Sequence, residues 1–277
     1  MTKDLNTKEA VKLASEMFPF KEYMTAGPTL RQVYFNIGNT VVKHLKRGSK
    51  ILDFGSGPCD KTAVLQLLGY ECYAYDDLAD DWHQNPGNKD KIMDFAKQCG
   101  INFTLAKSYT IPYEKEYFDM VMLHSVIEHF HDSPRELLND LVALLKPGGL
   151  LFITVPNAVN IRKRLAVLLG KTNYTRFEEY YWYPDPYRGH VREYVKGDLL
   201  QLSDFLNLDV LEIKGCDNML EHRLGTVTKP LYLMLTGVLN GGKDCWLLVA
   251  KKREDWKLNK ELSTEELLKI FPNRHWQ

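Results

Sequence analysis

A glycine turn between two acidic residues has the residue types and the spacing of a ligand-binding site. The segment ILDFGSGPCD places Asp53 at the end of an apolar run, and Gly55, Ser56 and Gly57 follow it closely. The next apolar run, in CYAYDD, ends at Asp76. Glycine lets a backbone approach a ligand closely, and a carboxylate after the second run can accept hydrogen bonds from both hydroxyls of a ribose. The pattern predicts a ligand that contains a nucleoside.

The same turn lacks the features that dinucleotides and phosphates require. In the dinucleotide fingerprint a third glycine allows a helix to pack tightly on a strand, but Asp60 stands there instead. No lysine follows the glycines as in a phosphate-binding loop, and Pro58 removes one amide donor. The carboxylate of Asp53 suits a cationic ammonium group. A ribose with a cationic amino-acid tail and no phosphate describes S-adenosylmethionine, and Asp60 is expected to cap the helix that follows.

Four segments carry a resemblance to a known family. They are ILDFGSGPCD, the acid in AYDD, IPYEKEYFDMVMLHSVIEHF and LLKPGGLLFITVPN, in this order over residues of about 50–157. Together they resemble the class I S-adenosylmethionine-dependent methyltransferases. The resemblance implies an enzyme that transfers the methyl group of S-adenosylmethionine to an acceptor.

The resemblance also implies how the chain holds the methionine part and the ribose of this cofactor. The backbone of Gly55, Ser56 and Gly57 is expected to approach the methionine part. Asp53 is expected to lie near its amino end. Asp76 is expected to hold the ribose.

The adenine end of the site departs from the family pattern. Asp77 or Leu78 is expected to flank the adenine. Many relatives have an acid where this chain has Lys107, which has no side-chain acceptor and cannot bind the adenine amino group in the same way. The amide of Ser108 could still serve. His124, just past the fourth expected strand, should face the cofactor cleft.

Several histidines could take the proton of an acceptor hydroxyl, a step that a neutral amine acceptor does not need. They are His124, His129, His131 and His190. His190 is the first candidate because it lies among aromatic and basic residues, and His129 is the second. The Glu128-His129 pair is widespread in the family, and its alternative role is to stabilise a turn. Some related O-methyltransferases carry an acid four residues before this pair, but His124 stands there, so no metal site is expected.

The segment YYWYPDPYRGHVREY indicates what kind of acceptor the enzyme uses. Aromatic rings stack on sugars or planar rings, and arginines hold carboxylates or phosphates. We expect Tyr181, Arg188 and Arg192 to bind the substrate, with the basic run 162–164 adding to an anion site. The alternative is a structural lid whose charges are solvated. The ending Gly-His-Val-Arg-Glu-Tyr is similar to methyltransferases associated with bacterial glycan and polysaccharide synthesis.

These features favour O-methylation of a small acceptor such as a sugar, a nucleotide-sugar or another sugar-linked anion. Two alternatives stay open. The acceptor could be a quinone-like phenol, a lipid headgroup or an amino-sugar nitrogen. The chain could also bind S-adenosylmethionine without turnover, which intact Gly55, Gly57 and Asp76 argue against and Lys107 slightly favours.

Strands and helices alternate in a way that can bring these residues together. Apolar runs predict strands, and Gly, Pro and capping signals separate them from helices with apolar residues at helical spacing. The expected strands are Ile51–Phe54, Glu71–Tyr75, Ile101–Ala106, Phe118–Leu123, Leu150–Val155, Val210–Lys214 and Cys245–Lys251. The prediction is an α/β fold with a doubly wound, mostly parallel, seven-stranded Rossmann-like sheet and an antiparallel terminal strand.

A single methyltransferase domain is expected over residues 1–277. Its parts are an N-terminal helical cover (1–48), a cofactor-binding core (49–157), an inserted lid (158–196), terminal helices and strands (197–254) and a C-terminal tail helix (255–277). The tail contains the capping-box pattern Ser263-Thr264-Glu265-Glu266. The apolar run 230–239 is too short to cross a bilayer, and a buried helix is favoured over a contact with a membrane surface.

The composition argues against several other classes of protein. The 36 Lys and Arg balance the 36 Asp and Glu, so net charge gives no reason to expect a nucleic-acid partner. The five cysteines are scattered without a C-x-x-C pair, which favours a reducing compartment over disulfides or structural zinc. The N-terminal residues lack the apolar core of a secretion signal. A cytoplasmic protein without stable membrane association is expected, and its oligomeric state stays open.

Overall fold

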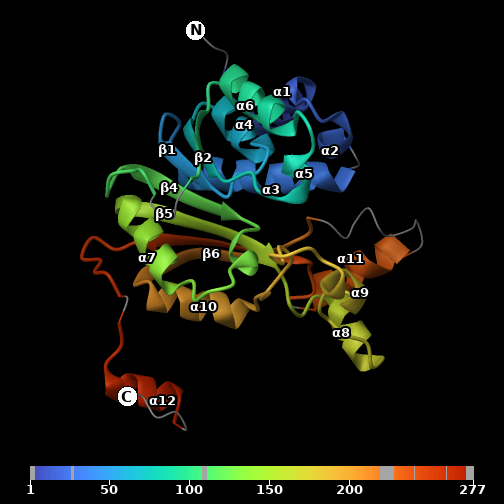
Figure 1. The fold of residues 1–277 in the computed structure, drawn as a ribbon, viewed down its shortest axis with the longest axis vertical. Coiled ribbons are helices and arrows are strands. Elements are labelled where there is room, and N and C mark those ends of the chain that lie inside the picture. Colours follow the sequence, from blue (N-terminus) through green and yellow to red (C-terminus); the bar gives the residue numbers. More distant parts are fainter. Residues whose placement is uncertain are drawn as a thin grey trace.

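A seven-stranded sheet forms the centre of the computed structural model, which describes residues 4–25, 28–107, 111–218, 228–239, 241–259 and 261–272 (Figure 1). Its strands are β1 (Lys50–Phe54), β2 (Glu71–Asp76), β3 (Asn102–Leu105), β4 (Phe118–His124), β5 (Leu145–Pro156), β6 (Leu208–Cys216) and β7 (Cys245–Lys252). They lie in the order β3-β2-β1-β4-β5-β7-β6. Neighbours from β3 to β5 are parallel, whereas β7 runs antiparallel to both β5 and β6. The predicted mostly parallel sheet with an antiparallel terminal strand is confirmed.

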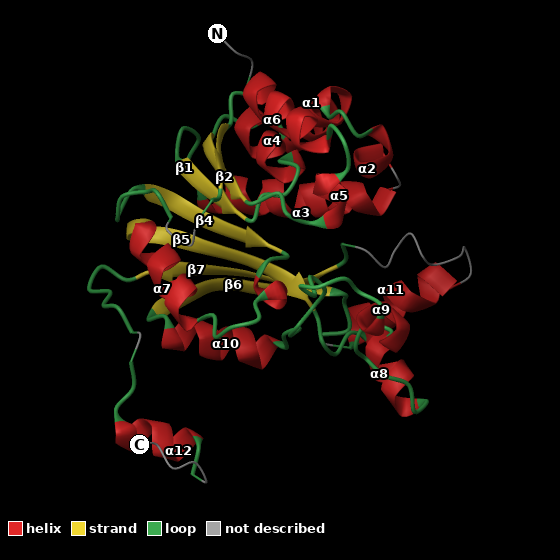
Figure 2. Cartoon of the chain, in the orientation of Figure 1, coloured by secondary structure: helices red, strands yellow, loops and turns green. Residues whose placement is uncertain are grey.

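Helices cover both faces of this sheet, as Figure 2 shows. One face carries α1 (Thr7–Met17), α3 (Pro28–His44), α4 (Asp60–Leu67) and α6 (Asn88–Cys99), and the other carries α7 (Arg135–Leu144) and α10 (Lys196–Phe205). Because helices lie on both sides, the central residues of β1 and nearly all of β4 are buried. This burial explains why both strands have nearly unbroken apolar sequences.

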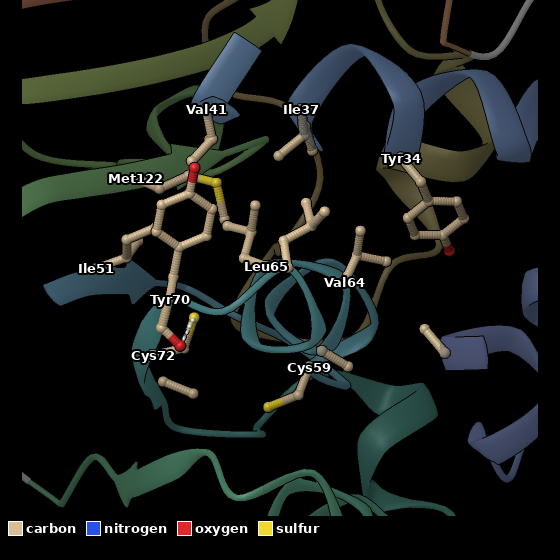
Figure 3. Packing of buried hydrophobic residues seen from close by; sticks show 14 of the residues in the cluster. Tyr34, Ile37, Val41, Ile51, Cys59, Val64, Leu65, Tyr70, Cys72 and Met122 are labelled. Atoms are coloured by element: carbon tan, nitrogen blue, oxygen red, sulfur yellow. Dashed lines mark hydrogen bonds between the residues drawn. The ribbon is translucent and has the colours of Figure 1, made fainter. Parts of the chain in front are cut away.

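The helical cover packs into the core rather than lying loosely on it. Tyr34, Ile37 and Val41 of α3 belong to the same buried cluster as Val64 and Leu65 of α4 (Figure 3). Their spacing of three and four residues places the three α3 side chains on one face of that helix. Each buried aliphatic side chain contributes roughly 1.5–3 kcal/mol to folding. The predicted cover divides into α1, the short α2 (Lys21–Thr25) and α3.

Most local signals for helix ends lead to the elements they predict. The basic run 162–164 lies in the helix α8 (Ile161–Leu168), whose N-cap Asn160 accepts from the Lys163 amide. The tail helix α12 (Thr264–Ile270) begins with the predicted capping box, in which the Glu266 amide donates to the Ser263 hydroxyl at 3.3 Å. Three short elements were not predicted, namely α5 (Asp81–Gln84), the 3-10 turn η1 (Ile127–His129) and α9 (Phe177–Tyr181). They lie in loops, where apolar periodicity is too short to indicate a helix.

The apolar run 230–239 lies almost entirely in α11 (Thr228–Val238), but this helix is not buried all round as predicted. Tyr232 and Thr236 are buried one turn apart, whereas Leu231 and Met234 are 53% and 60% exposed. Among the described residues, only one face of α11 has a packing partner. The helix is therefore less buried than its apolar composition predicts. In the described part of the chain, no helix is both long enough and apolar enough to pass through a bilayer.

The strand order reverses between β1 and β4, which creates the usual ligand-binding edge of such sheets. Ligands of open α/β sheets bind beyond the carboxyl ends of the strands at this switch point. The turn 55–57 follows β1, Asp76 ends β2, and Ser125 follows β4, so all three lie at this edge. In Figure 1, α8, α9 and α11 lie beyond the carboxyl end of β5. The fold therefore brings the lid to the same edge as the glycine turn.

Candidate active site

The turn after β1 is shaped for the close approach of a ligand. Gly55 and Gly57 have φ values of +73° and +53°, a left-handed conformation that glycine adopts readily. A Cβ atom at Gly55 would lie 2.6 Å from Cγ2 of Val126, in the loop after β4. The Gly55 amide donates to the Tyr75 carbonyl at 2.8 Å and joins the turn to β2. Both the conformation and the space at position 55 therefore require glycine.

Backbone amides from two loops hold the carboxylate of Asp76. Its Oδ2 accepts from the Gly57 amide and its Oδ1 accepts from the Leu78 amide, each at 2.7 Å. Burial raises the pKa of Asp76, and these two hydrogen bonds oppose the shift. Each oxygen keeps a second lone pair, so the carboxylate can still accept from two ribose hydroxyls. The adjacent Asp77 is exposed and accepts from the Ala79 amide.

Asp53 is a buried carboxylate at the end of β1. Its side chain is almost inaccessible, and the Thr62 hydroxyl donates to its Oδ2 at 2.5 Å. Burial raises the pKa of Asp53 to about 7, while the bond from Thr62 and the charge of Lys61 act in the opposite direction. A carboxylate in this environment gains strongly from a cationic partner. Asp53, Gly55 and Gly57 line one cavity, as a site for an amino-acid tail requires.

Asp60 does not cap α4, contrary to the prediction. The helix begins one residue earlier than expected, so Cys59 takes the cap position and Asp60 lies in the first turn. Its Oδ2 accepts from the Tyr34 hydroxyl of α3 at 2.5 Å and lies 2.9 Å from the Lys61 Nζ. Asp60 therefore ties the helical cover to the glycine turn.

The remaining predicted cofactor residues lie on other parts of this edge. His124, the last residue of β4, lines the same cavity as Asp53. Its Nδ1 lies 2.5 Å from the Thr154 hydroxyl, and burial lowers its pKa well below the usual value, so the ring is neutral at neutral pH. Lys107 lines a second cavity. Ser108 lies outside the described residues.

Two adjoining cavities open at the edge of the sheet. The first has a volume of about 810 Å³ and the second about 730 Å³. Gly55, Asp76, Asp80 and Ser125 line both, so the glycine turn lies where they meet. Away from this turn the lining of the first cavity includes several polar and charged residues beside apolar ones, namely Asn160, Arg162, Lys163, His190, Glu193, Asn218 and Asp244. The site therefore combines a nucleoside-binding end with a polar end.

Hydrogen bonds from histidines hold the lid against the loop after β4. His129 Nδ1 lies 2.8 Å from the Arg188 carbonyl, and His131 Nε2 lies 2.7 Å from the Tyr187 carbonyl. A carbonyl oxygen only accepts, so each of these nitrogens carries a hydrogen and donates. In neutral His129 the other nitrogen, Nε2, is therefore left with a lone pair.

The two predicted base candidates lie next to each other. The ring centroids of His129 and His190 are 5.0 Å apart, with an angle of 82° between the rings. His190 Nδ1 lies 3.0 Å from a carboxylate oxygen of Glu193, whose other oxygen pairs with Lys163 of α8. Burial lowers the pKa of His190 to about 4, and the neighbouring His129 and Lys163 add to the shift. Neutral His190 thus donates from Nδ1 and has a lone pair on Nε2.

Glu128 is a site residue that was not predicted, although it precedes His129 in the sequence. Its side chain is fully buried and lines the first cavity together with His190. Within the described ranges, neither carboxylate oxygen has a hydrogen-bond partner. Burial raises the pKa of Glu128 to about 8. The Glu128 amide and the Ser125 side chain act in the opposite direction, although neither forms a hydrogen bond with the carboxylate. Its adjacency to His129 was the signal that could have identified it.

The three predicted substrate residues lie in different places. Arg188 lines the second cavity and pairs with Asp77 at 3.7 Å and Asp80 at 3.3 Å, so it links the lid to the loop after β2. Tyr181 is 62% exposed on α9. As far as the described residues define the two cavities, neither Tyr181 nor Arg192 lines them. The structure brings Arg188 to the site and leaves the other two outside it.

The sequence is similar to those of known methyltransferases. A sequence model described as a methyltransferase domain matches residues 29–213. An uncharacterized methyltransferase of Schizosaccharomyces pombe is 28% identical over 116 residues, which are 39% of this chain and 40% of that protein. The mitochondrial ubiquinone biosynthesis O-methyltransferase of Rattus norvegicus is 30% identical over 129 residues, 45% of this chain and 35% of that protein. The chain thus spans less than half the length of either relative.

A solved structure agrees in fold. The 1,6-didemethyltoxoflavin-N1-methyltransferase of Burkholderia thailandensis, with its substrate and S-adenosylhomocysteine bound, matches with a TM-score of 0.52. The match covers 88% of this chain and 87% of that chain at 16% identity, which shows the fold alone. The domain model covers more than half of the present chain, so the chain belongs to the methyltransferase-domain family. It is a class I methyltransferase, and S-adenosylmethionine is its cofactor.

Proposed function

We propose that this methyltransferase methylates a hydroxyl oxygen of a small polar acceptor, namely a sugar or a sugar-linked anion. The observation that carries the proposal is the polar lining of the first cavity beyond the glycine turn. An acceptor with several hydroxyls can form hydrogen bonds with amide, carboxylate and basic side chains of this lining, which an apolar acceptor cannot do. Arg162 and Lys163 add positive charge that suits an acidic group on the acceptor.

The residues of the glycine turn fit S-adenosylmethionine. Gly55 and Gly57 permit close approach of the backbone, Asp76 retains acceptor capacity for the ribose, and Asp53 suits the amino group. We assign the remaining contacts to Ser56, Asp77, Ser108 and His124. When bound, S-adenosylmethionine supplies a methyl group on a positively charged sulfur. The chain contributes the orientation of both partners, which is a large part of catalysis in such transfers.

The proton of the acceptor hydroxyl leaves at the pair formed by His129 and His190. The Arg188 carbonyl and Glu193 each hold one ring by its Nδ1–H. This orientation leaves a lone pair on Nε2 of both rings, as a proton acceptor requires. A neutral amine acceptor would not need this pair, so its presence favours oxygen.

Turnover with a panel of acceptors tests the proposal. Formation of S-adenosylhomocysteine is measured with nucleotide sugars, free sugars, phenols and amines. Turnover above the acceptor-free rate is expected with one or more sugar derivatives, and acidic sugars should be preferred. Activity on amines with none on any hydroxyl acceptor would overturn the assignment to oxygen.

One observation favours a second candidate, a phenolic or quinone-like acceptor. The rat relative is by name a ubiquinone biosynthesis O-methyltransferase, but the match covers 35% of it. Both candidates use an oxygen acceptor and the same histidine pair. Turnover on catechols together with none on sugars would select the phenolic candidate.

A further inference from the structure

Three side chains form a cluster of the metal-binding type where the two cavities adjoin, Glu128 and His190 lining the first cavity and His129 the second. Glu128 and His129 belong to η1, and His190 comes from the lid. Each offers one ligand atom, and the three atoms lie within 4.8 Å of one another. The cluster differs from the arrangement that the sequence argues against, in which an acid would stand at position 124.

Both imidazoles are oriented as metal ligands usually are. A histidine that binds a metal commonly donates its other N–H to a carbonyl or a carboxylate, which fixes its tautomer and its orientation. His129 donates from Nδ1 to the Arg188 carbonyl, and His190 donates from Nδ1 to Glu193. In each ring the nitrogen that remains, Nε2, carries the lone pair that a cation requires.

The carboxylate of Glu128 gives an independent indication of a missing partner. It is fully buried, and the described part of the chain offers neither oxygen a hydrogen bond. An unpaired buried carboxylate costs at least about 1–3 kcal/mol. Protonation would not remove this cost, because the new O–H would also need an acceptor. The nearby ammonium of Lys163 pairs with Glu193 instead, so a cation bound between the imidazoles would satisfy Glu128.

We propose that Glu128, His129 and His190 bind a divalent transition-metal cation. Two imidazoles and one carboxylate suit ions such as Zn²⁺, Mn²⁺ or Co²⁺, whereas Mg²⁺ and Ca²⁺ prefer oxygen ligands alone. Three protein ligands leave at least one coordination position open. Because Glu128 and His190 line the first cavity, an oxygen of the acceptor can reach this position from that cavity.

The use of this cation in catalysis rests on the proposed function, but its binding does not. A hydroxyl bound to a divalent cation has a lowered pKa and releases its proton to water, while its oxygen stays bound. In the cation-bound site His129 and His190 act as ligands, so they take the acceptor's proton only when no cation is bound. A sugar with two adjacent hydroxyls could bind the cation through both oxygens.

Binding of Co²⁺ to the full chain tests the site without any turnover. After removal of metal by a chelator, one Co²⁺ per chain is expected, with the visible absorption bands of a bound ion. Glu193→Gln loosens His190 and should weaken binding about 10- to 100-fold, and Glu128→Gln and His190→Ala should weaken it more. His131→Ala is the matched control, because His131 also donates to a lid carbonyl but lies outside the cluster; it should leave binding unchanged.

Binding of Co²⁺ to the chain without substitutions is enough to test the proposal, even where a variant fails to fold. No one-to-one Co²⁺ signal would overturn it, and so would equal losses in the control and in Glu128→Gln. Turnover of S-adenosylmethionine is measured separately, before and after the chelator. Cation binding without turnover on any hydroxyl acceptor supports the cation site and counts against the proposed function. If the chelator does not change turnover and the chain binds no Co²⁺, the result counts against the cation site alone.

Discussion

The glycine turn after β1 and the lid corner around His190 share one cavity but are built in different ways. At the turn, backbone amides do most of the positioning, and two of them hold the carboxylate of Asp76 at 2.7 Å. At the corner, Glu193 links His190 to Lys163 of α8, and His129 of η1 donates to the Arg188 carbonyl. There the carboxylate of Glu128 has no hydrogen-bond partner in the described part of the chain. Backbone hydrogen bonds fix the carboxylate at the turn, whereas the carboxylate at the corner has none among the described residues.

Packing differs between the same two regions. Cys59 and Leu65, at the start and near the end of α4, are fully buried beside the glycine turn. Around the lid, Leu168 and Trp182 are 80% and 78% exposed. The methyl-donor site therefore lies against the hydrophobic core. The surface of the lid around Leu168 and Trp182 lies outside the core, so residues there can change with little effect on the fold.

His190→Ala is expected to separate the two regions most clearly. Loss of this imidazole should lower turnover about 10²- to 10⁴-fold, because it removes a proton acceptor or a cation ligand. The affinity for S-adenosylhomocysteine, measured by calorimetry, should stay unchanged because the glycine turn keeps its contacts. His129→Ala should behave in the same way. A parallel fall in cofactor affinity in both variants would show that the corner and the turn are not independent.

Asp76→Ala should have the opposite effect. Two hydrogen bonds to a charged acceptor, worth about 1.5–3 kcal/mol each, are lost, so affinity for S-adenosylhomocysteine should fall at least about 100-fold. Asp77→Ala removes an exposed carboxylate from the next position and serves as the control, with a smaller expected loss. Equal losses in the two variants would mean that charge near the cofactor matters and that the fixed position of Asp76 does not.

The sheet and the glycine turn could be predicted because their signals are local. In the core, β1 is followed by Gly55, β2 ends at Asp76 and β5 ends at Pro156. The spacing of Gly55, Gly57 and Asp76 reflects positions at which only a few residue types fit. Asp60 was misjudged because its role depends on where α4 begins. A shift of one residue moves it from the cap position to a bond with Tyr34.

The lid corner could be predicted only in part, because it depends on contacts between distant segments. The sequence singles out His129 and His190 separately, but it does not show that the lid folds back and brings them together with Glu128. Tyr181 is the converse case: its assignment to the substrate site follows from composition, and in the structure it is 62% exposed on α9 and is not among the described residues that line the two cavities. Aromatic and basic composition indicates a type of chemistry, while position follows from tertiary packing.

Gly55→Ala compared with Gly87→Ala tests whether the turn needs glycine for its space or only for its conformation. Both glycines have left-handed φ values, +73° and +80°, so each variant should lose about 1–2 kcal/mol of unfolding free energy in urea denaturation. Only at Gly55 would the new Cβ meet Val126, at 2.6 Å, whereas nothing lies within 4 Å at Gly87. Gly55→Ala alone should also weaken S-adenosylhomocysteine binding, by about tenfold. Unchanged binding would contradict a close approach at this turn.

The pH dependence of cofactor binding gives the smallest effect and isolates Asp53. Burial raises the pKa of Asp53 to about 7, and the negative charges of Asp60 and Asp76 add to this shift. The hydrogen bond from Thr62 and the charge of Lys61 lower the pKa. Affinity for S-adenosylhomocysteine should therefore rise a few-fold from about pH 6 to about pH 8, as Asp53 loses its proton and attracts the amino group. Its contribution to the unfolding free energy runs the other way, being full below about pH 4 and lost as pH rises through about 7. Calorimetry and urea denaturation of Asp53→Asn should show both slopes flattened, and an unchanged binding slope in this variant would assign the titration to another group.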